Sequence, residues 1–180
     1  MIDEEIDRTC VRRCLEGDLD AFATLIDRYQ HPIFNAIFHM VRNYDDAHEI
    51  CQQVFMKVYE HLNSYDPNRK FFSWIYRAAM NESINHLKAR REWEPLSEGV
   101  AALEPGPAER FESMERERSV RAAVMALDTN YRAVIVLRHF LELSYEEASE
   151  LLDVPVKTVK SRLFTARQLL REWFVSRGGV

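Results

Sequence analysis

The feature that most constrains this chain is the uneven distribution of its helix-breaking residues. Three of its six prolines and two of its five glycines fall within positions 94–108 of a 180-residue chain. Proline interrupts a helix and glycine weakens one, so a chain otherwise poor in both favours long helices. We therefore expect an all-α fold of two small helical domains, spanning 1–93 and 111–180 and joined by a flexible linker at 94–110.

The remaining composition narrows the class of protein. The sequence is 47% hydrophobic, but no apolar run is long enough to span a bilayer, and the acidic N-terminus does not resemble a signal peptide. We expect a cytoplasmic chain without membrane insertion. Its three cysteines, Cys10, Cys14 and Cys51, are expected to be free thiols, because no further ligands lie near them at metal-site spacing.

Hydrophobic periodicity predicts four helices before the linker and four after it. The predicted spans are about 4–16, 18–41 if the helix runs past Pro32, 46–59, 71–91, 111–127 and 131–140, followed by two helices close to the C-terminus. The first helix is expected to end at Gly17, a residue suited to a helix C-terminus.

The last two helices are predicted to form a helix-turn-helix. Ser144 to Glu147 has the form of a capping box, and Pro155 interrupts one helix while suiting the first turn of the next. Positions 142–153 hold five acidic residues and no basic one, whereas 155–177 hold six basic residues and one acidic. A basic second helix can enter a major groove, although a solvated basic face is the simpler alternative. The candidate DNA-binding residues are Lys157, Thr158, Lys160, Ser161, Arg162, Phe164, Thr165 and Arg167.

The helix predicted at 71–91 begins with aromatic residues, continues with amides and ends with basic residues. Unpaired bases stack on aromatic rings while cations follow the phosphate backbone, so this order suits single-stranded nucleic acid. We expect Trp74, Ile75, Ala78 and Leu87 to be core residues in the first instance. The candidate DNA-binding residues are Phe71, Phe72, Trp74, Arg77, Asn81, Asn85, His86, Lys88, Arg90 and Arg91.

Several motifs follow one another along the chain in a particular order. They are Gly17-Asp18 with Ala21-Phe22 and Arg28-Tyr29; Asp46-Ala47 with Gln52-Gln53-Val54-Phe55; Phe72 to Arg77 with Asn81 and Asn85-His86-Leu87; and Leu143 to Ala148 with Val154 to Leu163. In this order and spacing the chain resembles the extracytoplasmic function sigma factors, the smallest group of the sigma-70 family. The last string is the most specific of them.

The resemblance implies that the two domains have different functions. Region 2, at 1–93, would bind the clamp of core RNA polymerase, and the candidate residues of the helix at 71–91 would melt and read the minus-ten element of promoter DNA. Region 4, at 111–180, would read the minus-thirty-five element through the candidate residues of its last helix and would touch the polymerase flap. The polymerase performs the chemistry, so no catalytic residue and no cofactor are expected, and family members are commonly held inactive by an anti-sigma factor. The residues implied in polymerase binding are Asp46, Glu49, Gln52, Gln53, Phe55 and Tyr59.

Four positions depart from the family pattern. Gln53 replaces a usual acidic residue, Lys157 a common glycine and Thr165 a common arginine, and Cys51 is also atypical. From the residues alone, a two-domain helix-turn-helix regulator that does not melt DNA is the rival interpretation. An enzyme is a distant third, because we find no phosphate-binding glycine loop and no nucleophile with a partnered base.

Overall fold

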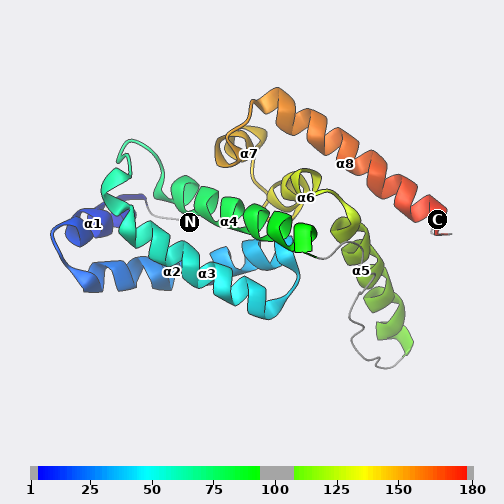
Figure 1. Ribbon diagram of the computed structural model, residues 1–180, viewed down its shortest axis with the longest axis horizontal. Coiled ribbons are helices and arrows are strands. Elements are labelled where there is room, and N and C mark those ends of the chain that lie inside the picture. Colours follow the sequence, from blue (N-terminus) through cyan, green and yellow to red (C-terminus); the bar gives the residue numbers. More distant parts are fainter. Residues whose placement is uncertain (1–3, 94–107, 178–180) are drawn as a thin grey trace.

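The computed structural model describes residues 4–93 and 108–177, which form two helical halves (Figure 1). The N-terminal half contains α1 (Glu4–Leu15), α2 (Leu19–Val41), α3 (Tyr44–Glu60), the short helix η1 (Leu62–Ser64) and α4 (Phe71–Trp93). The C-terminal half contains α5 (Ala108–Ala126), α6 (Thr129–Ile135), η2 (Val136–Phe140), α7 (Tyr145–Leu152) and α8 (Val156–Ser176). No strand occurs in these two ranges, which confirms the predicted all-α class.

The predicted linker is described only in part. Helix α5 begins at Ala108, so its first residues occupy positions that the sequence analysis assigned to the linker. The rest of that segment, 94–107, lies outside the described residues. The domain boundaries therefore stay a prediction.

Polar side chains fix the starts of α2 and α3. Asp18 and Asn43 each accept hydrogen bonds from two backbone amides of the following turn, at 2.9–3.2 Å. Such caps satisfy amides that the helix itself leaves unpaired, and each contributes about 1 kcal/mol. Gly17 has a φ of +94°, which a side chain would strain, and this turn ends α1 as predicted.

Helix α2 runs through Pro32 without interruption. A proline inside a helix removes one backbone hydrogen bond and crowds the preceding turn. The flanking side chains Tyr29, Ile33 and Ile37 are at most 1% exposed, so packing on both sides of the proline holds the helix together. The predicted continuation past Pro32 is confirmed.

The core of the N-terminal half lies between α2, α3 and α4. Leu25, Val54, Ile75 and Met80 are all completely buried there. Burying one such side chain contributes about 1.5–3 kcal/mol, so α2 and α3 form the rigid support for α4.

A buried carboxylate ties α1 to this core. Asp7 is 1% exposed, and its two oxygens lie 3.0 Å from the Arg28 guanidinium and 2.6 Å from the Tyr29 hydroxyl. The hydroxyl donates to the carboxylate, and burial together with this bond raises the pKa of Tyr29. The Arg28-Tyr29 motif therefore anchors α1. Asp7 was not identified from the sequence. It shares the buried face of α1 with Cys10 and Val11, but its partners lie 21 and 22 positions away along the chain.

The helix predicted at 131–140 is present as one continuous segment, but only its first part is an α-helix. Helix α6 ends at Ile135, and η2 continues it as a π-helix over Val136–Phe140. The Leu141 amide bonds to the Val136 carbonyl at 3.1 Å, five residues back, and widens this turn. Such π segments are often found at functional sites.

The two halves contact each other. Helix α4 packs against α6 and α7, and α2 packs against η2. Figure 1 shows α7 beside the first turns of α4, with α8 running away from the N-terminal half toward the C-terminus.

Candidate nucleic-acid interface

The C-terminal half forms the predicted helix-turn-helix from α7 and α8. The Ser144 hydroxyl oxygen accepts from the Glu147 amide at 3.0 Å, and the Glu147 carboxylate accepts from the Ser144 amide at 2.8 Å. This is the predicted capping box, and the bond from the Ser144 amide lowers the pKa of the Glu147 carboxyl. Asp153 ends α7 with a φ of +53°, and Pro155 starts α8, so the turn between them is tight.

One face of α8 is apolar and holds the helix against the domain. Val159, Leu163 and Ala166 are at most 2% exposed, whereas the predicted apolar positions Val156 and Leu170 are half-buried at the edge of the contact. A helix anchored along one face can present the other to DNA.

The predicted minus-thirty-five residues divide into an exposed set and a half-buried set. The exposed residues are Lys157, Lys160, Ser161, Phe164 and Arg167. The half-buried residues are Thr158, Arg162 and Thr165. Phe164 is 66% exposed, which is unusual for a large apolar side chain and fits a surface that meets a partner.

Residues that the sequence analysis missed adjoin this face. The Arg138 guanidinium lies 4.5 Å from the Tyr145 ring centroid, and the Lys160 ammonium lies 5.2 Å from it. His139 lies 3.3 Å from the Arg167 guanidinium, and burial together with the neighbouring arginines lowers the pKa of His139. The π-helix brings Arg138 and His139 to this position. No local pattern in the sequence signals it.

The predicted minus-ten residues of α4 do not all lie on the surface. Asn81, Asn85, Lys88 and Arg90 are exposed, and His86 is half-buried. The side chain of Arg91 lies outside the described residues.

The aromatic residues at the start of α4 pack mainly within the protein. Phe71 is only 2% exposed and contacts the Tyr29 and Tyr65 rings, so it is a core residue and its predicted place at the DNA surface is not observed. Phe72 and Trp74 are half-buried and partly accessible. Of the four residues expected in the core, Ile75 is fully buried, while Trp74, Ala78 and Leu87 pack at its margin.

The residues implied in polymerase binding lie along α3. Glu49, Gln52 and Gln53 are exposed, and the Gln53 amide donates to the Glu49 carboxylate at 3.1 Å. Tyr59 is 47% exposed and meets the Phe22 ring edge-on. Phe55 is only 8% exposed, so it supports this face from within.

Asp46, the remaining member of the predicted polymerase-binding set, is directed toward α4. Its Oδ2 atom lies 3.3 Å from the Arg90 guanidinium and 3.3 Å from His86 Nε2. The structure therefore joins a residue expected at the polymerase to two residues expected at the DNA.

Polar contacts join α4 to α7. The Arg77 guanidinium donates to the Glu150 carbonyl at 2.5 and 3.2 Å and lies 3.4 Å from Asp153, while Ser73 donates to the Glu150 carboxylate at 3.3 Å. A cavity of about 490 Å³ beside them is lined by residues of both halves. Arg77, expected at the minus-ten DNA, is thus occupied by the C-terminal half.

A buried arginine joins the halves at the other end of the contact. Arg132 is 6% exposed and donates to the Met40 carbonyl of α2 at 2.9 Å, as well as to the Met125 and Leu127 carbonyls. It thereby pairs one carbonyl that the end of α2 leaves open. Nearby, the His39 ring stacks on Phe140 with centroids 4.1 Å apart.

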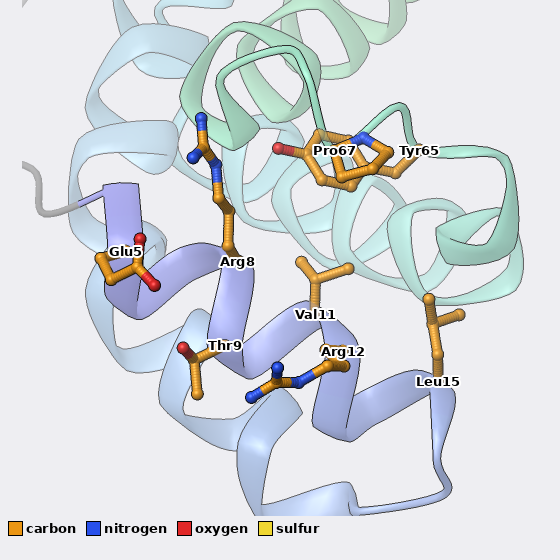
Figure 2. A pocket seen from close by; sticks show the side chains of 8 residues that line it. All are labelled: Glu5, Arg8, Thr9, Val11, Arg12, Leu15, Tyr65 and Pro67. Atoms are coloured by element: carbon orange, nitrogen blue, oxygen red, sulfur yellow. The ribbon is translucent and has the colours of Figure 1, made fainter.

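A further cavity lies apart from all predicted site residues. It has a volume of about 470 Å³ and is open between one face of α1 and the turn that carries Tyr65 and Pro67 (Figure 2). Arg8 extends toward that turn, and Val11 lies beneath it. The cavity is therefore a feature of the N-terminal half alone.

The cysteines are free and mostly buried. Cys10 and Cys51 are buried and Cys14 is half-buried. Burial raises the pKa of the Cys51 thiol to about 11, and it also raises the pKa values of Cys10 and Cys14. Among the described residues, no group of three or more His, Cys, Asp or Glu side chains is arranged to hold a metal ion. No helix in the described ranges is long and apolar enough to cross a membrane.

The structure defines an all-helical protein of two packed halves, the second of which contains a helix-turn-helix. A model of sigma-70 region 2 matches residues 25–92, and a model of sigma-70 region 4 matches residues 117–170. The chain is 33% identical over 174 residues to the ECF RNA polymerase sigma factor SigW of Bacillus subtilis, covering 90% of this chain and 93% of the relative. It is 34% identical over 182 residues to the RNA polymerase sigma-H factor of Pseudomonas aeruginosa, covering 94% of each chain.

The chain therefore belongs to the extracytoplasmic function sigma factors of the sigma-70 family and is an alternative sigma factor. Solved structures agree in fold. CnrH in complex with the cytosolic domain of CnrY matches with a TM-score of 0.69 at 24% identity, covering 95% of this chain and 98% of that one. The sigma factor RpoE in complex with the anti-sigma factor NepR from Bartonella quintana matches with a TM-score of 0.66 at 19% identity, covering 85% and 96%.

Proposed function

We propose that this sigma factor reads promoters at two separate points, with α4 on the non-template strand of the minus-ten element and α8 in the major groove of the minus-thirty-five element. The observation that carries this proposal is the placement of two different polar faces on two halves. The face of α4 combines exposed amides with cations, which suits unpaired bases, whereas α8 combines cations with an apolar anchor, which suits duplex DNA.

The contacts are assigned accordingly. At the minus-ten element we assign Phe72, Trp74, Arg77, Asn81, Asn85, His86, Lys88, Arg90 and Arg91; at the minus-thirty-five element we assign Lys157, Thr158, Lys160, Ser161, Arg162, Phe164, Thr165 and Arg167. The nucleotidyl transfer belongs to the polymerase, so this chain contributes no catalytic residue and works in the cytoplasm, where the polymerase works.

Promoter reading requires the two halves to separate. The positions that give the two elements their names, minus ten and minus thirty-five, are about 25 base pairs apart. This separation is about 85 Å at 3.4 Å per base pair. Helices α4 and α7 pack directly against each other, and packed helices lie only about 8–10 Å apart. The packed arrangement therefore cannot reach both elements at once, and the contacts of Arg77 and Arg132 must break before initiation.

Two protein partners follow from this function. Core RNA polymerase would bind the exposed face of α3 through its clamp and the C-terminal half through its flap. The titles of two similar structures name complexes with CnrY and with the anti-sigma factor NepR. An anti-sigma factor that stabilises the packed arrangement would hold this chain inactive.

The test is initiation by holoenzyme reconstituted from core RNA polymerase and the full chain. Permanganate should detect melted DNA at promoters mapped by transcript start sites. A chain ending at Trp93 should lose promoter-specific initiation, because two weak sites gain affinity by being linked. Polymerase-independent DNA binding without melting would instead support a helix-turn-helix regulator, and normal initiation by the truncated chain would contradict two-point reading.

A further inference from the structure

The contact between Asp46 and α4 assigns a role that the family resemblance does not. Asp46 lies in the first turn of α3, and a single carboxylate oxygen approaches two groups of α4 from there: the Arg90 guanidinium and His86 Nε2, both at 3.3 Å. The Asp46 side chain is 24% exposed, against 49% for Arg90. Its position between the helices leaves it poorly placed to reach a separate protein.

The Asp46 contact restricts how His86 can meet DNA. The Nε2 atom of His86 is inaccessible to solvent and has no partner with hydrogen-bond geometry. It faces the Asp46 carboxylate at 3.3 Å, so Nδ1 is the ring nitrogen that this contact leaves for a ligand. Arg90 directs its Nη1 atom toward the same carboxylate oxygen.

The contact is not needed to hold α3 and α4 together. Ile50, Val54, Ile75 and Met80 are at most 2% exposed in the core between these helices and their neighbours. Lys57 and Glu82 form a second link between the helices at 2.7 Å. Partly exposed ion pairs add little to stability, so the Asp46 contact restricts side-chain motion more than it stabilises the fold.

We propose that Asp46 is a positioning residue for minus-ten recognition, which holds His86 and Arg90 in the orientation that meets the single strand. The proposal rests on the proposed function, because it assumes that α4 binds that strand. Ordering a long side chain before binding removes a cost that binding would otherwise carry. Asp46 therefore favours strand binding even though its charge opposes that of the phosphates.

The neighbouring residue Asp45 provides a matched control. It lies in the same helical turn, is exposed, and is absent from the predicted binding set. Asp45→Asn and Asp46→Asn remove the same charge at nearly the same place, so both raise the general attraction to DNA equally. Any difference between them reports the contact with α4.

The experiment uses holoenzyme made from core RNA polymerase and the full-length chain. The probe is a short fluorescent non-template strand that carries the minus-ten element of a promoter mapped by transcript start sites. Asp46→Asn should bind this strand about threefold to tenfold more weakly than Asp45→Asn, the range expected for immobilising one long side chain. Asp46→Glu, which retains the carboxylate, should recover part of the loss. Core-polymerase affinity and melting temperature should match those of Asp45→Asn.

A double-mutant cycle tests whether Asp46 affects strand binding through His86 and Arg90. In a His86→Ala Arg90→Ala background, Asp46→Asn should cause no further loss of strand binding. Equal affinity of Asp45→Asn and Asp46→Asn would overturn the proposal, as would tighter binding by Asp46→Asn, which would mean that the carboxylate masks the cations. If Asp46→Asn weakens only the affinity for core polymerase, Asp46 is a polymerase-binding residue and the proposal is wrong. Failure of the unaltered holoenzyme to bind the strand would refute the proposed function instead.

Discussion

The two helices assigned to DNA differ in how much of their polar surface is already engaged. On α4, Arg77 is bound by α7, and His86 and Arg90 face Asp46 of α3. On α8, Lys157 and Phe164 are exposed on a helix fixed by its opposite face. The comparison indicates that the exposed face of α8 is accessible in the packed arrangement, whereas on α4 the Arg77 side chain is released only when the C-terminal half moves away.

The largest expected effect concerns Arg132, the buried residue that joins the two halves. Arg132→Leu leaves the Met40, Met125 and Leu127 carbonyls without this donor, so we expect the free energy of unfolding to fall by about 2–4 kcal/mol. Two of these three carbonyls belong to the C-terminal half. Hydrogen exchange should therefore accelerate more in residues 108–177 than in 4–93.

The control for Arg132 is Arg171→Leu, which removes the same side chain from an exposed position of α8. It should change the free energy of unfolding by no more than about 0.5 kcal/mol. An equal effect of both substitutions would show that the buried contacts of Arg132 do not stabilise the protein. Acceleration of exchange confined to residues 108–177 would show that Arg132 does not couple the two halves.

A smaller effect separates the two DNA-reading helices. Lys160→Ala or Arg162→Ala should weaken binding of the holoenzyme to minus-thirty-five duplex by about 1–3 kcal/mol, with a shallower salt dependence if the lost contact is to phosphate. Asn85→Ala should leave that binding unchanged and reduce permanganate reactivity at the minus-ten element. Arg171→Ala serves again as the control on α8. If neither Lys160→Ala nor Arg162→Ala weakens duplex binding, the basic face of α8 is a solvated surface that does not contact DNA.

Local signals explain how well the sequence predicted α8. The capping box of Ser144 and Glu147 and the break at Pro155 are each decided within a few residues, and all three have the expected geometry. Contacts between the halves have no such signal. Arg132 and Met40 are 92 positions apart, and Arg77 and Glu150 are 73 apart, so neither pair could be found without the fold.

Sequence patterns also fail to predict the surroundings of some individual residues. Phe71 stands in a run that resembles a base-stacking segment, yet it contacts Tyr29 because α2 passes directly beneath the start of α4. The π-helix that places Arg138 beside Tyr145 depends on packing against α2 and α7, which the composition of that segment does not reveal. The sequence therefore predicts the helices themselves better than it predicts which of their side chains are exposed.

The smallest expected effect is a pH dependence of the contact between the halves. Burial, and then the cations of Arg42 and Arg121, lower the pKa of His39 where its ring stacks on Phe140, and Glu117 beside Arg121 moderates the local charge. The packed state therefore favours the neutral ring, and separation lets the ring take up a proton. This stabilisation is fully present above about pH 6.5, the ordinary pKa of histidine, and is lost as the pH falls from there through the lowered pKa of the packed state.

Small-angle scattering of the free chain should accordingly show a larger radius of gyration below about pH 6.5 than at pH 8. His39→Phe retains a ring against Phe140 without a titrating group, so its radius should vary less over the same range. His139 also has a lowered pKa, but it lies against Arg167 within the C-terminal half and remains in this variant. If His39→Phe expands as much as the unaltered chain, the response belongs to His139 or another group, and the stacked contact does not control separation.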